Sequence, residues 1–172
     1  GFGSLDLARG SYTCFYEALA GGYGGRHGSD GPDAVQAHGQ NTENAPIEET
    51  ELNYPVRIAR LSPAEDSEGP GRFRGGLGLR KDFCVLQPTT FTILADRDRK
   101  GPWGAFGGHD AGVAAYVLIH DGAETRLGSK STTELVAGDI VSVRSCGGGG
   151  YGPPEERDPE RVLRDVLEGK VS

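Results

Sequence analysis

The sequence predicts a mainly β domain, an antiparallel sandwich or barrel-like, with a long polar loop and one C-terminal helix. Three observations support this fold class. Apolar and polar residues alternate in several short runs, glycine and proline separate these runs, and only residues 158–168 show a clear helical pattern. A length of 172 residues fits a single domain over residues 1–172. The 29 glycines indicate many tight turns and close backbone approaches.

The first part of the chain predicts extended structure followed by turns. Residues Ser11–Ala20 are rich in aromatic side chains, which favours a strand. The run GGYGGRHG that follows predicts either a sharp chain reversal or backbone N–H groups converging on an anion, and both interpretations stay open. The stretch Gly28–Tyr54 is polar, contains two prolines and matches neither helix nor strand. It is therefore expected to be a long ordered loop across the scaffold.

The middle of the chain predicts three strands. The first strand has alternating apolar residues and one solvated face, and it spans Leu52, Tyr54, Val56 and Ile58. Pro55 removes a backbone donor, so this strand is expected at a sheet edge. Two further alternating runs flank the Gln87-Pro88 turn and predict an antiparallel hairpin. These runs are Leu77, Leu79, Lys81, Phe83, Val85 on one side and Phe91, Ile93, Ala95 on the other.

The last third predicts two more strands and the helix. Ala115, Val117 and Ile119 alternate and lead into the hairpin turn signal Asp121-Gly122. The segment Val136–Asp139 turns the chain into a strand over residues 140–143.

The C-terminal helix has a recognisable beginning and end. Asp158 is the expected N-cap before proline, and Gly169 ends the helix. Its apolar residues share one face, expected to dock on the sheet: Val162, Leu163, Val166 and Leu167. Two ion pairs at i,i+4 spacing are expected on the other side: Glu160–Arg164 and Arg161–Asp165.

Composition excludes several classes of function. A net charge of −7 argues against nucleic acid and anionic membranes as partners. Three distant cysteines predict neither a disulfide framework nor a cysteine zinc site, which fits the reducing cytoplasm. No apolar run approaches 18 residues and no signal peptide pattern is present, so a soluble chain is expected. The chain begins Gly-Phe-Gly and lacks methionine. We interpret it as a segment of a longer polypeptide, with a processed or truncated product as the alternative.

The familiar catalytic motifs are missing or out of context. Gly147–Gly152 matches G-x-G-x-x-G by letter, but Pro153-Pro154 follows where a phosphate-binding helix would begin, so a dinucleotide site is rejected. No P-loop and no G-x-S-x-G elbow occur. The four histidines lack ligand spacing, and structural roles are favoured for them. Ligands that converge from distant positions, such as His38 with Glu48 and Asp96, stay open as an alternative.

The candidate site residues come from the polar loop and from the charged run after residue 95. They are expected to bind substrate or to line an interface: His38, Asn41, Thr42, Glu48, Asp96, Arg97 and Arg99. The alternatives are a solvated loop and a solvated strand end.

Four blocks of sequence resemble one known family. They are GGYGGRHGSDGPDAVQAHGQNTENAPIEETELNYPVRI, GPGRFRGGLGL, DRDRKGPWGAFGG and LVAGDIVSVRSCGGGGYGPPEERDPERVLRDVLEGKVS. In order and over nearly the whole chain, these blocks are similar to the C-terminal part of the hydantoinase B/5-oxoprolinase family. That family includes the B-like subunits of acetone and acetophenone carboxylases.

The resemblance implies a role in an ATP-dependent enzyme. Family members work with an A-type subunit or domain that uses ATP to phosphorylate an amide or enolate oxygen. They then hydrolyse a cyclic amide or carboxylate a ketone. ATP would thus act through the partner, and a divalent metal would belong to the N-terminal part of the B component. The resemblance therefore assigns no cofactor and no metal ligand to this chain.

Three functional hypotheses follow. In the first, the chain belongs to a cyclic amide hydrolase, and Arg97 and Arg99 meet an anionic intermediate while His38, Asn41, Thr42 and Glu48 shape a substrate or subunit-interface cavity. In the second, it is a structural and assembly module, with Trp103 packed against a partner or the N-terminal part. In the third, it serves a ketone carboxylase. The isolated chain is expected to be inactive.

Overall fold

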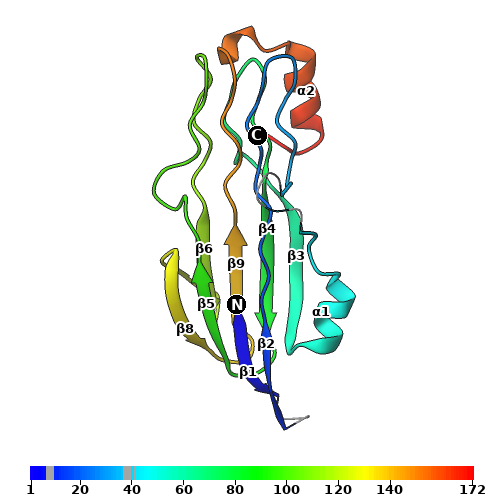
Figure 1. The fold of residues 1–172 in the computed structure, drawn as a ribbon, viewed down its shortest axis with the longest axis vertical. Helices are drawn as coiled ribbons and strands as arrows, with labels where there is room; N and C mark the ends of the chain where they lie inside the picture. The colour runs from blue at the N-terminus through cyan, green and yellow to red at the C-terminus, as the bar shows by residue number, and fades with distance from the viewer. Residues whose placement is uncertain (7–9, 37–39, 41) are drawn as a thin grey trace.

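The computed structural model describes residues 1–6, 10–36, 40 and 42–172 and shows two antiparallel sheets packed face to face (Figure 1). The four-stranded sheet has the order β2-β1-β5-β8, and the five-stranded sheet has the order β3-β4-β9-β6-β7. The first sheet contains β1 (Phe2–Asp6), β2 (Ser11–Phe15), β5 (Thr89–Leu94) and β8 (Lys130–Leu135). The second contains β3 (Val56–Ala64), β4 (Gly78–Val85), β6 (Ala115–His120), β7 (Ala123–Arg126) and β9 (Ile140–Arg144). The expected antiparallel sandwich is confirmed, and the sheets do not close into a barrel.

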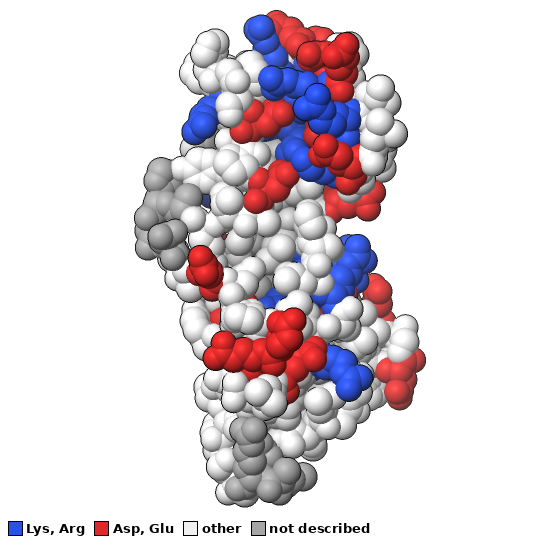
Figure 2. Space-filling view, turned by 90° about the vertical axis from the view of Figure 1, so that its right-hand side faces the viewer, with Lys and Arg blue, Asp and Glu red and all other residues white. Residues whose placement is uncertain are grey.

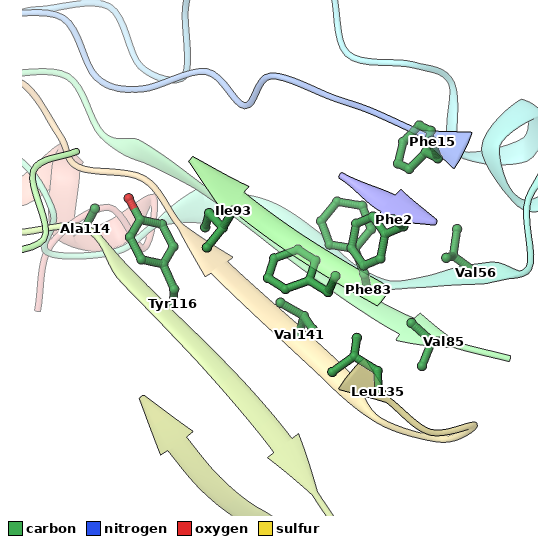
Figure 3. Packing of buried hydrophobic residues seen from close by; sticks show 11 residues of the cluster. Phe2, Phe15, Val56, Phe83, Val85, Ile93, Ala114, Tyr116, Leu135 and Val141 are labelled. Atoms are coloured by element: carbon green, nitrogen blue, oxygen red, sulfur yellow. The ribbon is translucent and has the colours of Figure 1, made fainter. Parts of the chain in front are cut away.

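Aromatic side chains from both sheets form the centre of the core (Figure 3). The ring of Phe2 on β1 lies 4.9 Å from the ring of Phe83 on β4 and 4.9 Å from that of Phe91 on β5. Phe15 on β2 stacks at 6.1 Å from Phe2. Val141 on β9 is fully buried beside them. Tilted ring pairs at these distances add stabilisation beyond the area that they bury.

The predicted hairpin around Gln87-Pro88 is wrong. Both strands exist, but β4 pairs with β3 and β9, whereas β5 pairs with β1 and β8 in the other sheet. The connection carries the chain across the sandwich: Gln87 Nε2 already donates to the carbonyl of Leu5 on β1, at 2.6 Å. Alternation reveals which face of a strand is buried, and it does not reveal the partner strand.

The polar stretch 28–54 contains a helix that was not expected, α1 (Ile47–Asn53). Glu48 and Glu49 lie in its first turn, where negative charge is favourable, and Thr50 is buried. The following strand therefore begins at Val56, and the predicted start at Leu52 is wrong. The edge position predicted from Pro55 is confirmed, because β3 is the outer strand of its sheet.

Other predicted elements agree with the structure. β6 and β7 form a hairpin through Asp121 and Gly122, which both have positive φ (48° and 78°). Residues 136–139 turn into β9, with Asp139 N donating to Val136 O at 3.1 Å. The glycine run after residue 20 leads to a chain reversal at residues 26–29. Strands β1 and β8 had not been predicted.

Above the sheets in Figure 1, extended glycine-rich segments lie against one another. We call residues 21–31, 69–76, 101–108 and 147–150 the glycine layer. Gly148 illustrates its packing: a Cβ there would lie 2.0 Å from the carbonyl oxygen of Tyr23. Backbone hydrogen bonds join the segments, among them Gly148 N to Gly76 O at 2.9 Å and Gly25 N to Gly149 O at 2.9 Å. The G-x-G-x-x-G letters therefore serve close backbone packing.

The C-terminal helix, α2 (Pro159–Leu167), follows a single 3-10 turn, η1 (Pro154–Glu156). Asp158 caps α2 as predicted, by accepting from the backbone N–H of Glu160 at 2.9 Å. The expected docking face is wrong. Asp165 is the buried residue of α2, whereas the apolar residues on the predicted face are all at least 40% exposed. Within the described ranges, no helix has the length and apolar character needed to cross a bilayer.

Candidate functional site

A half-open cavity of about 530 Å³ lies between the two sheets. Its walls include the apolar side chains of Phe83, Phe91 and Ile93 from the core, with Tyr16 and Leu94 exposed at its rim. Phe83 comes from one sheet and Phe91 from the other, so the sandwich itself forms the cavity. Concave apolar sites of this volume are typical of small-molecule binding.

A buried ion pair supplies charge at the cavity wall. Lys81 on β4 is 0% exposed, and its ammonium donates to both carboxylate oxygens of Glu17, at 2.9 and 2.7 Å. The same ammonium lies 5.2 Å from the centre of the Phe83 ring. Glu17 lines the cavity and is itself nearly buried. Buried charges persist when they are paired, and this pair meets that condition.

Described residues of the polar stretch 28–54 contact the same wall at three positions. The backbone N–H of Ala45 donates to Glu17 Oε1 at 3.2 Å, and Gln36 Nε2 donates to the carbonyl of Ala18 at 2.9 Å. Gln40 lines the cavity. The described parts of this stretch are therefore attached to the segment that carries Glu17, as expected for a loop held on a scaffold.

Of the four predicted loop residues, the structure describes Thr42 and Glu48. His38 and Asn41 lie outside the described residues. Thr42 is exposed, and Glu48 is exposed in the first turn of α1, beside the edge strand β3. Neither Thr42 nor Glu48 lines the cavity.

The charged run after β5 begins directly after the cavity-lining residues 91–95. Asp96 follows the lining residue Ala95 directly, and its exposed carboxylate is 2.7 Å from Lys130 Nζ. Arg97 and Arg99 are exposed, and Arg97 has a positive φ of 66°. The Lys130 hydrogen bond and charge hold the pKa of Asp96 below its usual value. Among the described residues, no three His, Cys, Asp or Glu side chains gather in a way that could hold a metal ion.

Two titratable groups near Asp96 are shifted towards their neutral forms. Burial raises the pKa of Tyr116 to about 12, and its hydroxyl donates to the carbonyl of Asp96 at 3.0 Å. Burial also raises the pKa of the Cys146 thiol, although the charge of Arg97 opposes this shift. Tyr116 lines the cavity, so the end near Asp96 presents a neutral hydroxyl.

Sequence reasoning missed Glu17 and Lys81. The sequence contained a signal for Lys81, because this lysine lies on the apolar face of its alternating strand, between Leu79 and Phe83. A lysine at such a position is expected to be buried and therefore paired. No comparable signal marks Glu17, which follows a strand in an irregular segment.

A second polar cluster fixes α2 to the glycine layer, where acidic and basic side chains intermingle (Figure 2). Asp165 lies 2.7 Å from Arg157 Nη2 and 3.2 Å from Arg74 Nε, in place of the predicted pair with Arg161. Asp30 contacts both Nη atoms of Arg157, at 2.8 and 3.0 Å. These buried ion pairs explain why α2 turns its polar side inwards.

The pKa values in this cluster follow from the same contacts. Burial alone would raise the pKa of Asp30, but the hydrogen bond and charge of Arg157 hold it below its usual value. Burial would also raise the pKa of Asp33, but its hydrogen bonds hold this pKa below the usual value. Arg74 donates to Asp33 at 2.9 Å, and the backbone N–H of Leu77 donates at 2.9 Å. Both carboxylates are therefore ionised over the physiological pH range.

Comparison with known proteins gives one family. The family described as Hydantoinase B/oxoprolinase matches residues 1–154. 5-oxoprolinase 1 of Arabidopsis thaliana is 34% identical over 139 residues, which are 80% of this chain and 11% of that protein. The crystal structure of an ATP-dependent caprolactamase from Pseudomonas jessenii has a TM-score of 0.73 at 28% identity, over 89% of this chain and 28% of the other.

The fold also matches acetone carboxylase in its nucleotide-free structure. The TM-score is 0.82 over 99% of this chain and 27% of the carboxylase chain, at 20% identity, which shows likeness of fold alone. This chain spans no more than 28% of the length of the relatives it matches first. Since the family match covers most of the chain, this protein belongs to the hydantoinase B/oxoprolinase family.

Proposed function

We propose that this chain is the C-terminal region of the B component of an ATP-dependent cyclic amide hydrolase. The observation that carries the proposal is the family match across residues 1–154. The likeness to a caprolactamase, whose named substrate is a lactam, supports amide hydrolysis as the reaction. The cavity between the sheets supplies a concave, mainly apolar site of suitable size.

In this proposal, chemistry is divided among several parts of an assembly in the cytoplasm. An A-type subunit or domain would supply ATP-dependent activation of the amide oxygen, and the N-terminal part of the B component would hold a metal that could supply activated water. This chain contributes binding surface. His38, Asn41, Thr42 and Glu48 contact the substrate or a neighbouring subunit. Arg97 and Arg99 meet an anionic intermediate, and Asp96 belongs to the same substrate-binding or interface surface.

The test is turnover by the complete complex. ATP-dependent hydrolysis of hydantoin, 5-oxoproline and caprolactam is measured for the complex with the unchanged chain and with Arg97→Ala plus Arg99→Ala. A matched control is Arg57→Ala, another exposed arginine on the edge strand β3.

We expect the double variant to lose at least about tenfold in kcat/KM, since hydrogen bonds to charged groups contribute about 1.5–3 kcal/mol each. The control is expected to retain full activity. ATP-independent turnover, or no hydrolysis of any cyclic amide, would refute the proposed reaction.

The double variant Asn41→Ala plus Glu48→Ala tests the role of the loop in the same assay. Unchanged kcat and KM would remove the loop from the mechanism.

A second function, assembly, is favoured by one observation. The side chain of Phe106 is 79% exposed at a positive φ of 52°, and Trp103 nearby is 66% exposed. Holding an exposed aromatic residue in the left-handed region costs free energy twice, through backbone strain and solvated apolar surface. The test is co-purification of an A-type partner with Trp103→Ser plus Phe106→Ser, against the exposed control Leu61→Ser. Loss of the partner in the first variant alone supports assembly, and equal recovery refutes it.

A further inference from the structure

We infer that the cavity between the sheets binds a neutral lactam ring, whose N–H donates to the carboxylate of Glu17. This inference rests on the proposed function for the class of substrate and adds the residue that receives the amide. It follows from three features of the cavity: an unused acceptor, a neutralised charge and an apolar wall.

The unused acceptor belongs to Glu17. Its Oε1 atom accepts from Lys81 Nζ at 2.9 Å and from Ala45 N at 3.2 Å, whereas Oε2 accepts from Lys81 Nζ alone, at 2.7 Å. Each carboxylate oxygen can accept two hydrogen bonds. Among the described contacts, Oε2 therefore keeps one acceptor position, on a side chain that lines the cavity.

The charge balance selects a neutral ligand. Lys81 has no exposed surface and already compensates the carboxylate of Glu17. A charged group placed directly against this pair would have no partner there, which is strongly unfavourable in an apolar environment. A neutral N–H group satisfies the free acceptor and leaves the Glu17–Lys81 pair intact.

The remaining walls fit the rest of a lactam. Phe83, Phe91 and Ile93 provide apolar surface for ring methylene groups. The carboxamide of Gln40 is one lining group that can donate to the amide carbonyl, whereas Tyr116 already donates its hydroxyl proton to Asp96 O. A volume of about 530 Å³ also leaves room for ring substituents.

The experiment measures binding to the 172-residue chain by NMR. Amide chemical shifts are followed during titration with 2-piperidinone and, separately, with N-methyl-2-piperidinone, which lacks the N–H donor. We expect saturable shifts in the millimolar range for the first compound, at residues 17–19, 93–95 and 116. The N-methyl compound is expected to bind about tenfold more weakly or worse, since it leaves a charged acceptor without its donor.

A paired substitution removes the acceptor without leaving a buried charge. Glu17→Leu plus Lys81→Met replaces both partners with apolar groups, which is close to neutral for folding. The spectrum of this variant verifies its fold, and we expect it to bind the two compounds equally. A preference for the N–H compound that survives in the variant overturns the role of Glu17. Absence of saturable shifts at the cavity residues, or equal binding by the unchanged chain, overturns the inference.

These outcomes are distinct from those that test the proposed function. If the complex hydrolyses cyclic amides and the paired variant leaves its KM unchanged, the reaction stands and the Glu17 site fails. If the chain binds the lactam selectively but the complex hydrolyses no cyclic amide, the site stands and the proposed reaction fails.

Discussion

Substitution of Gly148 by alanine is the sharpest test of how this protein is built. Gly148 lies buried in the glycine layer, where the added Cβ would be 2.0 Å from the Tyr23 carbonyl oxygen. Side-chain carbons essentially never approach a backbone atom within 3.0 Å, so the two segments must separate by about 1 Å. The obstructing atom belongs to backbone and cannot rotate away.

The cost follows from the hydrogen bonds that the displacement strains. Gly148 N donates to Gly76 O at 2.9 Å, and Gly69 N donates to Gly148 O at 2.8 Å. A buried polar group left without its partner costs about 1–3 kcal/mol, so two strained bonds predict a loss of about 2–6 kcal/mol. This is a large fraction of the stability of an ordinary domain, about 5–15 kcal/mol.

Urea denaturation measures the effect, with Gly128→Ala as the matched control. A Cβ at Gly128 meets no atom within 4 Å. The control is expected to be neutral or stabilising by up to about 1 kcal/mol, because alanine lowers the entropy of the unfolded chain. A Gly148→Ala protein within about 0.5 kcal/mol of the unchanged chain would refute the close-packed glycine layer, since ordinary surface substitutions have effects of that size.

Three further predictions concern charged groups. Asp165→Asn removes the buried carboxylate that anchors α2. Broken buried ion pairs typically cost about 3–5 kcal/mol in the free energy of unfolding, and we expect a loss near the lower end of this range. Urea denaturation measures the loss, and amide exchange in α2 should become faster. The hydrogen bond that protonated His120 donates from Nδ1 to the Asp139 carboxylate, at 2.6 Å, raises the pKa of His120. NMR titration should therefore give a pKa above about 6.5, and Asp139→Asn should lower it. The stability that this pair contributes should be lost as pH rises through the folded pKa. The pKa values of Asp30 and Asp33 lie below their usual value, so the stability that these carboxylates contribute should be fully present above about pH 4 and lost as pH falls through their folded pKa values. When both are replaced by Asn, the Tm should therefore fall less at low pH.

Local patterns in the sequence were sufficient for much of the sandwich. Alternation located β4, β5 and β6, the turn at Val136–Asp139 located β9, and Pro55 placed β3 at an edge. These features act within a few residues. The partner of β4 was beyond reach, because pairing across the sandwich depends on contacts between distant segments. The same limit applies to α2, where the apolar stripe predicted the wrong buried face. Its orientation is decided by Arg74 and Arg157, whose positions the helix sequence does not contain.

The candidate site was predicted only in part. The polar loop was correctly expected to lie on the scaffold, since Gln40 lines the cavity and Ala45 contacts Glu17. Individual residues could not be ranked from composition, because a short polar run contains many equivalent candidates. Lys81 was the informative exception, as a charged residue in an apolar register implies a buried partner elsewhere in the chain.

The glycine layer also has a consequence for the order of folding. Its segments come from four separated stretches, and the last of them, residues 147–150, lies between the others near the end of the chain. Hydrogen bonds connect it to Gly25, Gly69 and Gly76. Contacts so distant in sequence require large loops to close first, which slows folding. During synthesis, the first three segments must therefore wait for the fourth, and the upper part of the molecule becomes ordered only after residues 147–150 have been made.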